Sequence, residues 1–290
     1  MHHGKVVIVC SNRAAAFCLV VAFCQAAIAQ ECILGLPSKP AASQGTLIVG
    51  GGGKLPDAVY DEFVKLAGGK TARLVHIPWA HPFSNLKTVK YRYSGWKEYD
   101  VQSFDFLGAN SRQEAEDNRA IAVLEKATGV WIGGGTQGRL VNFYRGTKVE
   151  AALRRVLERG GVIGGTSAGA AVLSQTMIRY SESHEATVDT GFDLLRAATV
   201  DQHFSQRGRH TRLVGVLDKH PELIGIGVDE GTALFVTGDQ LRTIGKSQVS
   251  LFVPTLGRQP TLLYRLRDGD RGMLERNGKT GQVSLSLQAG

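Results

Sequence analysis

The segment Gly165-Thr166-Ser167-Ala168-Gly169 has the composition of a turn that presents a nucleophile. It follows the apolar residues Val162 and Ile163 and precedes a run of small residues, so the sequence predicts a strand, a sharp turn and a helix. A serine on such a turn carries its hydroxyl above the sheet, and small neighbours leave space around it. We therefore expect Ser167 to be the nucleophile and the Ala168 amide to stabilise an oxyanion. A glycine turn without chemistry is the alternative interpretation.

A serine hydroxyl becomes reactive only when a base accepts its proton, and His203 is the best-placed candidate. It lies in Asp201-Gln202-His203-Phe204, directly after the largely apolar residues 197–200. Glu230 is the expected partner that orients this imidazole, and Asp229 is the alternative on the same turn between two apolar runs. The order serine, histidine, acid differs from the order serine, acid, histidine of α/β-hydrolases, which disfavours an ordinary esterase or lipase.

A second glycine turn, Gly133-Gly134-Gly135-Thr136-Gln137, follows its own predicted strand. An amide of Gly134 or Gly135 is expected to complete the oxyanion hole, and Gln137 to bind substrate. A plain strand-to-helix turn is the alternative. Two other motifs are set aside, because residues 50–53 lack the third glycine of a dinucleotide-binding turn and residues 245–247 lack the first glycine of a phosphate loop. We expect neither a cofactor nor a metal.

The elements that must position these residues alternate along the chain between strands and helices. Strand patterns cover residues 46–49, 72–78, 101–107, 129–132, 161–163, 223–228, 232–236 and 249–253. Helical patterns cover residues 56–66, 114–126 and 148–158. This alternation predicts an α/β fold with a doubly wound, mostly parallel sheet and helices on both faces. The site of such a sheet lies at the carboxyl ends of its strands, which places the nucleophile elbow at that edge.

Composition divides the chain into four parts. Lys5 and Arg13 precede an apolar run that ends in Ala27-Ile28-Ala29, which is the order of a secretory signal peptide over residues 1–29. We expect cleavage after Ala29 and a secreted or periplasmic protein without a membrane anchor; an N-terminal core helix or an anchor is the alternative. Residues 30–44 are expected to form a lead-in segment, residues 45–256 the catalytic domain, and residues 257–290 a C-terminal extension without a clear pattern. Cleavage leaves Cys32 as the only cysteine.

The charge balance bears on the kind of partner. The 290 residues carry a formal net charge of +8, with 43% hydrophobic and 21% charged residues, which is enough apolar material for one large core. Long runs of Lys and Arg interleaved with aromatic residues are missing from the sequence, so nucleic acid is disfavoured. A modest basic excess suits an anionic or zwitterionic substrate.

Four motifs resemble, in identity and in order, those of the cyanophycinase family, which also includes peptidase E. They are Gly-Gly-Gly-Thr-Gln (133–137), Gly-Gly-Thr-Ser-Ala-Gly-Ala (164–170), Asp-Gln-His-Phe with the three arginines that follow it (201–213), and Gly-Ile-Gly-Val-Asp-Glu (225–230). The resemblance implies a catalytic set of Ser167, His203 and Glu230 and a homodimer. It also implies a substrate site lined by Gln137, Asp201, Gln202, Arg207, Arg209 and Arg212.

The resemblance implies a substrate as well. Cyanophycinases hydrolyse cyanophycin, a poly-aspartate backbone that carries arginine on each β-carboxyl group, and release β-aspartyl-arginine. Guanidinium groups bind carboxylates bidentately, and acidic or amide groups such as Asp201 and Gln202 suit arginine side chains. A solvated basic helix face is the alternative for the arginine cluster, in which Arg209 and Arg212 share a face and Arg207 precedes the helix. We thus expect a secreted serine exopeptidase acting through an acyl-enzyme; the alternatives are a peptidase E-like aspartyl dipeptidase and a non-catalytic binding protein.

Overall fold

The computed structural model describes residues 45–82, 85, 87–89, 96, 98–182, 185–255, 261–277 and 279–288. The predicted signal peptide and the lead-in segment, residues 1–44, lie outside this part of the chain. Within it, no helix is both long and apolar enough to span a membrane.

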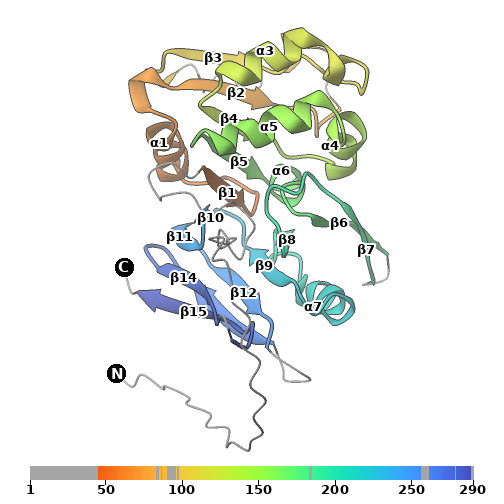
Figure 1. The fold of residues 1–290 in the computed structure, drawn as a ribbon, viewed down its shortest axis with the longest axis vertical. Helices are drawn as coiled ribbons and strands as arrows, with labels where there is room; N and C mark the ends of the chain where they lie inside the picture. The colour runs from red at the N-terminus through yellow and green to blue at the C-terminus, as the bar shows by residue number, and fades with distance from the viewer. Residues whose placement is uncertain are drawn as a thin grey trace, which may run out of the picture.

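The largest element is a nine-stranded mixed sheet (Figure 1). Its parallel half runs, in spatial order, β1 (Thr46–Gly50), β5 (Val162–Thr166), β4 (Gly129–Ile132), β2 (Arg73–Ile77) and β3 (Ser103–Phe106). Its antiparallel half continues from the other side of β1 with β10 (Thr232–Thr237), β11 (Gln240–Gly245), β14 (Arg271–Arg276) and β15 (Val283–Gln288). The predicted α/β class is therefore confirmed, but one half of the sheet is antiparallel, so it is not mostly parallel. Of the antiparallel strands, the sequence predicted β10 (as residues 232–236) and did not predict β11, β14 or β15.

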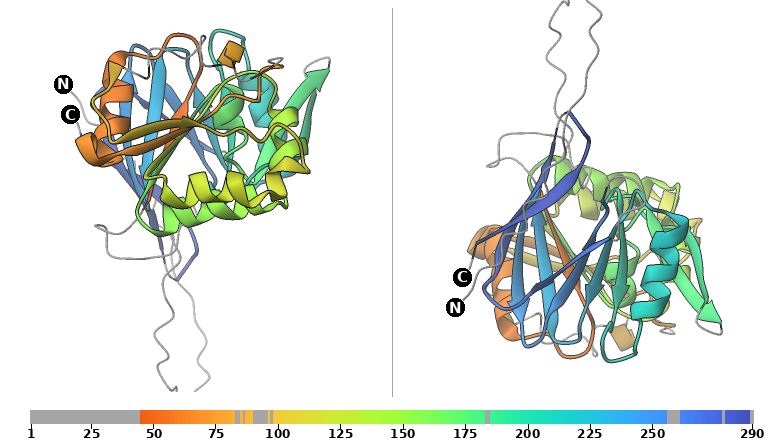
Figure 2. Two further views of the ribbon diagram at one scale, coloured as in Figure 1. Left: turned by 90° about the horizontal axis from the view of Figure 1, so that it is seen from above. Right: turned by 90° about the horizontal axis from the view of Figure 1, so that it is seen from below.

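Helices cover both faces of the parallel half (Figure 2). Helix α1 (Asp57–Leu66) packs on one face, and α3 (Asn118–Lys126), α4 (Gln137–Tyr144) and α5 (Lys148–Glu158) lie on the other. Strand β1 shows why two faces are needed, because successive side chains of a strand point in opposite directions. Leu47 and Val49 join the core that includes α5, whereas Ile48 joins the core beneath α1.

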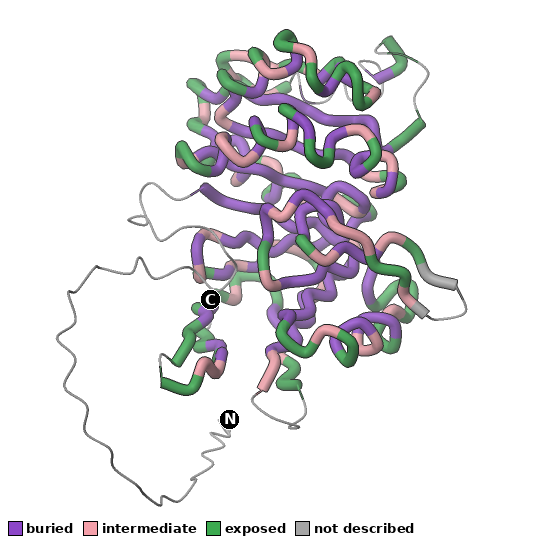
Figure 3. Tube along the Cα trace, turned by 45° about the vertical axis from the view of Figure 1, so that its right-hand side comes forward, coloured by how far each residue is buried: buried purple, intermediate pink, exposed green. Residues whose placement is uncertain are grey.

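The burial pattern follows from these layers. The central strands are buried along their length, while the helices alternate between buried and exposed residues (Figure 3). Strands buried on both faces read as continuous apolar runs, which is why residues 46–49 were recognisable as a strand. Single-turn helices at Gly69–Thr71 and Glu114–Glu116 complete this part of the fold.

A second sheet of four strands lies beside the first. It has the order β13 (Leu262–Leu266), β12 (Val249–Val253), β9 (Ile224–Val228) and β8 (Ala198–Gln202), and α7 (His210–Lys219) packs on it through Leu213, Val216 and Leu217. The hairpin of β6 (Thr176–Glu182) and β7 (Glu185–Thr190) adjoins it. Residues after 257 supply β13, β14 and β15, so the described part of the predicted C-terminal extension is built into the two sheets.

Candidate active site

Turns at the carboxyl ends of five strands converge on one place in the fold. Ser167 follows β5, and the two flanking parallel strands, β1 and β4, end in the glycine turns that begin at Gly50 and Gly133. His203 follows β8, and Glu230 comes two residues after β9, which runs parallel to β8 in the second sheet. The edge at which the sequence predicts chemistry is thus the junction of the two sheets.

The three predicted catalytic side chains form one chain of hydrogen bonds. The Oγ atom of Ser167 lies 2.8 Å from Nε2 of His203, and Nδ1 of His203 lies 2.5 Å from Oε1 of Glu230. The imidazole is buried, whereas the Glu230 side chain is 39% exposed. With Glu230 accepting the Nδ1 proton, Nε2 is free to accept the serine proton, which is the tautomer that general-base catalysis requires.

The backbone of Ser167 is held in a strained conformation. Its φ of 54° and ψ of −116° lie outside the regions that L-residues ordinarily adopt. Such a residue costs about 1–3 kcal/mol and persists only where its surroundings impose it. The surroundings here are close: a Cβ on Gly169 would lie 2.2 Å from the carbonyl oxygen of Ile132, so the turn and the short helix α6 (Ala168–Ala171) press directly onto β4. The expectation of a nucleophile elbow therefore matches the observed geometry.

The glycine turn after β1 holds the backbone of the catalytic set. The carbonyl oxygens of Gly50, Gly51 and Gly52 accept hydrogen bonds in turn from the amides of Ser167, His203 and Gly231, at 3.0, 2.7 and 3.0 Å. Three successive peptide groups thus fix the three segments that carry the nucleophile, the base and the acid.

The position of Gly52 leaves no room for a side chain. A Cβ at that position would lie 2.3 Å from Cε1 of the His203 ring, and the φ of Gly52 is 96°. These glycines lack the spacing of a dinucleotide-binding turn, so a motif match does not identify them. The signal that identifies them is positional, since they follow the first strand of an α/β sheet at the edge where catalytic groups gather.

Two backbone groups are placed to stabilise an oxyanion. Gly134 lies against the nucleophile, since a Cβ there would be 3.4 Å from that of Ser167. Gly135 instead packs against the backbone of Ala80, with a φ of 144°. Ala168 is the first residue of α6, and amides at the first turn of a helix have no acceptor within it. Of the two glycines predicted for the oxyanion hole, the geometry favours Gly134, together with Ala168.

Asp229, the alternative partner for the histidine, has a different role. Its side chain is 1% exposed, and its two oxygens accept hydrogen bonds from the Ser205 amide and the Ser247 hydroxyl, at 2.9 and 2.7 Å. It therefore braces the turn that carries Glu230, and Glu230 is the residue that contacts His203.

Burial is the main influence on the pKa of His203. It lowers the pKa of His203 below its ordinary value, the hydrogen bond to Glu230 raises it, and the positive charge of Arg207 lowers it again. The net effect lowers the pKa, which favours the neutral imidazole that can act as a base.

The acidic and basic residues of the motif at 201–213 bind mostly to one another. Asp201 is 1% exposed and accepts hydrogen bonds from Arg212, with Nε at 2.8 Å from Oδ2 and Nη2 in contact with Oδ1. Nη1 of Arg209 donates to the backbone and side-chain oxygens of Gln202, at 2.6 and 2.7 Å. The expectation that Asp201 and Arg212 contact substrate is therefore corrected, because both are buried and paired. They support the segment that carries His203.

Two other predicted substrate contacts are placed differently. Nε2 of Gln137 donates to the carbonyl oxygens of Ile178 and Arg179, at 2.8 and 2.9 Å, so this amide joins α4 to β6. Arg207 precedes α7, as the helical spacing predicted, and is exposed. Of the three arginines of the motif, Arg207 is the one whose guanidinium faces solvent close to the catalytic histidine.

Among the described residues there is no cluster of three or more His, Cys, Asp or Glu side chains able to hold a metal ion. The site is built from one hydroxyl, one imidazole, one carboxylate and backbone amides, and these groups are sufficient for acyl transfer.

Similarity to known proteins agrees with this geometry. Residues 46–244 match Peptidase family S51. A cyanophycinase from Synechococcus elongatus is 36% identical over 204 residues, which are 68% of this chain and 63% of that protein. A cyanophycinase from Trichormus variabilis is 34% identical over 230 residues, 74% of this chain and 76% of its own. A crystal structure of a peptidase from an acI-B1 Actinobacterium superposes with a TM-score of 0.61 at 21% identity and covers 79% of this chain and 97% of its own.

An α/β sheet whose carboxyl edge carries a serine on a strained turn, bonded to a histidine that is itself bonded to a carboxylate, is the arrangement of a serine-type hydrolase. The family match covers well over half of the chain and contains all three of these residues. The chain belongs to peptidase family S51. The resemblance found from the four sequence motifs is thereby confirmed.

Proposed function

We propose that this chain is a cyanophycinase-like serine exopeptidase that hydrolyses a β-linked aspartyl-arginine polymer through an acyl-enzyme. The observation that carries the proposal is the unbroken contact from Ser167 through His203 to Glu230. The similarity to cyanophycinases at 34–36% identity supports the substrate class. A peptidase E from Shewanella denitrificans is more distant, at 25% identity over 201 residues, so an aspartyl dipeptidase is the second candidate.

The proposed reaction has two halves. Ser167 Oγ attacks the scissile carbonyl carbon while Nε2 of His203 takes its proton, and Glu230 stabilises the imidazolium that forms. The amides of Gly134 and Ala168 donate to the oxyanion. The imidazolium then gives its proton to the leaving amine, the C–N bond breaks, and an ester on Ser167 remains. Water attacks that ester with His203 again as the base, and the second product leaves with a free carboxylate.

Arg207 supplies a recognition group for this reaction. It is exposed, it has no ion pair within the described part of the chain, and its charge reaches His203. Each unit of this polymer carries the free α-carboxylate of its β-linked arginine near the scissile backbone bond, and a guanidinium binds a carboxylate bidentately. Arg207 is therefore the arginine of the motif that we assign to the substrate carboxylate.

Replacement of the nucleophile tests the mechanism. Ser167→Ala removes only one hydroxyl, from a half-buried residue, so the fold should persist while hydrolysis of purified cyanophycin falls by about two or more orders of magnitude. Products are identified by mass spectrometry, and β-aspartyl-arginine is the expected one. A fluorophosphonate probe should label the wild type at Ser167 and leave the variant unlabelled.

Other outcomes separate the candidates. Cleavage of short α-aspartyl dipeptides without cleavage of the polymer would favour the peptidase E-like activity. A folded wild type that the probe does not label would favour a non-catalytic binding protein on this fold.

We further propose that the protein is exported and acts as a homodimer. The proposal of export rests on the order of charge, apolar run and small-residue cleavage site in residues 1–29. Mass spectrometry of the native protein should find Gln30 at its amino terminus, and light scattering should give twice the mass of one chain. An intact Met1 terminus on the active protein would refute the export.

A further inference from the structure

A pocket of about 580 Å³ opens beside the nucleophile. One wall is formed by Thr166, which precedes the nucleophile, and by Gly133 and Gly134 of the glycine turn after β4. The opposite wall comes from α1 and from residues near Trp96. A side chain of the substrate next to the scissile bond can therefore enter this pocket while its carbonyl lies at Ser167. Sequence motifs gave no sign of it, because α1 and Trp96 lie outside all four of them.

The pocket is acidic although the protein as a whole is basic. Helix α1 directs Asp57 and Asp61, one turn apart and on the same face, towards it, and Glu98 adds a third carboxylate. None of the described residues that line it is Lys or Arg. Asp57 and Glu98 are exposed and form no ion pair with any described residue. Three carboxylates thus face this space, and the described residues of the lining supply no counter-charge.

Aromatic rings form the remaining surface. Tyr60 lies 5.0 Å from Trp131 and 5.5 Å from Trp96 between ring centroids, and Trp96 lies 5.9 Å from Tyr99. These four rings are contiguous and all line the pocket. A flat cation that stacks on aromatic faces and donates to carboxylates in a fork is a guanidinium. An ammonium group makes the charge contact but has no plane to stack.

The two other titratable groups in the pocket leave its charge unchanged. Burial lowers the pKa of His76 to about 3, so this imidazole is neutral and does not repel a cation. Burial, followed by the carboxylates of Asp61 and Asp57, raises the pKa of Tyr99 to about 12, and its hydroxyl donates to Asp61 at 3.3 Å. Neither His76 nor Tyr99 therefore adds a positive charge to the described lining of the pocket.

We propose that this pocket binds the guanidinium of a substrate arginine next to the scissile bond, with Asp57 and Asp61 as its carboxylate partners. The inference rests on the proposed peptidase activity and adds the residues that select an arginine-bearing substrate. Asp201 and Gln202, which were expected to bind the substrate arginine, bind arginines of the protein itself. The proposal gives that role to residues of α1 instead.

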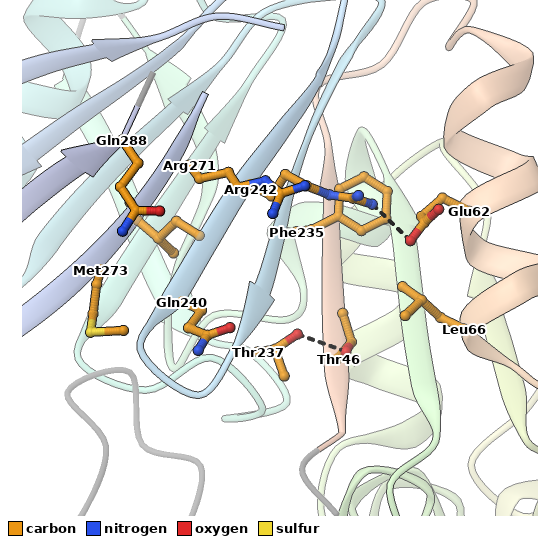
Figure 4. A pocket seen from close by; sticks show the side chains of 12 residues that line it. Thr46, Glu62, Leu66, Phe235, Thr237, Gln240, Arg242, Arg271, Met273 and Gln288 are labelled. Atoms are coloured by element: carbon orange, nitrogen blue, oxygen red, sulfur yellow. Dashed lines mark hydrogen bonds and ion pairs between the residues drawn. The ribbon is translucent and has the colours of Figure 1, made fainter. Parts of the chain in front are cut away.

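The other side of α1 provides a matched control. Glu62 is the neighbour of Asp61, but it points to a second pocket, where it forms a 2.9 Å ion pair with Arg242 (Figure 4). That pocket also contains Arg271, so its charge is mixed, and it includes none of the catalytic residues. Glu62→Gln removes one carboxylate from the same helix without touching the acidic pocket.

The test compares β-aspartyl-arginine oligomers with oligomers in which citrulline, a neutral isostere, replaces arginine. Charge-assisted hydrogen bonds predict a preference for arginine of about tenfold to a hundredfold in the wild type. Asp57→Asn/Asp61→Asn should lose that preference, retain its kcat/KM on the citrulline oligomer, and react with the fluorophosphonate probe at the wild-type rate. Glu62→Gln should behave as wild type. Asp61→Asn alone should show part of the effect. It also serves as a check on folding, because Asp57 lies in the first turn of α1, where an acidic residue stabilises the helix, and Asp61 does not.

A binding measurement separates failure of this inference from failure of the proposed function. Calorimetry with arginine amide should show binding to the wild type that weakens at least tenfold in the double variant, with citrulline amide binding neither protein. If the wild type cleaves neither oligomer but shows this binding pattern, the proposed function fails and the pocket assignment stands. If the double variant keeps its preference for arginine, or binds arginine amide as the wild type does, the pocket assignment is wrong.

Discussion

Two groups of charged residues flank the catalytic serine and histidine, and they differ in what neutralises them. On the side of the second sheet, Asp201 is bonded to Arg212, and Arg209 to Gln202, inside the protein. On the side of α1, Asp57 and Asp61 face an open pocket. The first group uses its charges to fix a segment of chain, whereas the second has charge left for a ligand. Proximity to a nucleophile therefore does not by itself make a charged residue a substrate contact.

The cost of burial separates the two groups. Burial lowers the pKa of Arg209 to about 10, although the carboxylate of Asp201 opposes this effect. A buried guanidinium stays charged only if partners inside the protein replace the water that it has lost. Breaking a buried pair by removing one member leaves an uncompensated charge, whereas an exposed carboxylate is solvated by water in any case.

The largest expected effect is on stability. Asp201→Asn keeps the shape of the side chain but removes a buried carboxylate that contacts both Arg212 and Arg209, so the free energy of unfolding should fall by about 3–5 kcal/mol. Asp61→Asn is the matched change in the open pocket and should alter it by less than about 0.5 kcal/mol. Urea unfolding followed by tryptophan fluorescence measures both. Equal effects of the two variants would refute the distinction between a structural group and a recognition group.

This distinction marks the limit of what the sequence predicts. Strands, elbow and catalytic set follow from local patterns, because each depends on a few neighbouring residues: residues 148–158 were predicted as a helix and are α5. Ser167, His203 and Glu230 were also selected correctly as a set that meets in space. Which charged side chains pair with one another is a different matter. The sequence of Asp201 and Arg212 is the same whether these side chains bind each other or a substrate, so it does not show which partner each has.

The antiparallel strands illustrate the same limit. Strand β15 lies at the edge of the sheet, pairs with β14 alone, and alternates between buried and exposed residues over its first four positions. Edge strands with one face in water give weak apolar patterns, which is why the residues after 257 had no firm assignment. The acidic pocket was missed for a related reason, since its two walls lie far apart in the chain and only the fold brings them together.

The next effect in size concerns Arg207, the exposed arginine of the motif. Arg207→Ala should lower kcat/KM on the β-linked polymer about tenfold to a hundredfold, because a charge-assisted contact of about 1.5–3 kcal/mol is lost. Arg207→Lys should recover only part of this loss, since lysine keeps the charge without the planar fork. Both variants should stay as stable as the wild type in the urea experiment, in contrast to Asp201→Asn. Unchanged kcat/KM in Arg207→Ala would favour the alternative interpretation of the arginine cluster, a solvated basic surface that does not contact substrate.

The smallest expected effect is on the pH profile, and it concerns the charge of Arg207. The positive charge of Arg207 lowers the pKa of His203, so its removal should raise that pKa. The base must be neutral to accept the proton of Ser167, and activity is therefore lost as the pH falls through the histidine pKa. In Arg207→Ala the acidic limb of the profile of kcat/KM should shift to higher pH, and in Arg207→Lys it should stay near that of the wild type. The carboxylates of the α1 pocket lie on the other side of the elbow, so Asp61→Asn should leave this limb in place. If the acidic limb shifts in Asp61→Asn and not in Arg207→Ala, then the pKa of His203 depends on the carboxylates of the α1 pocket and not on Arg207, and this prediction is wrong.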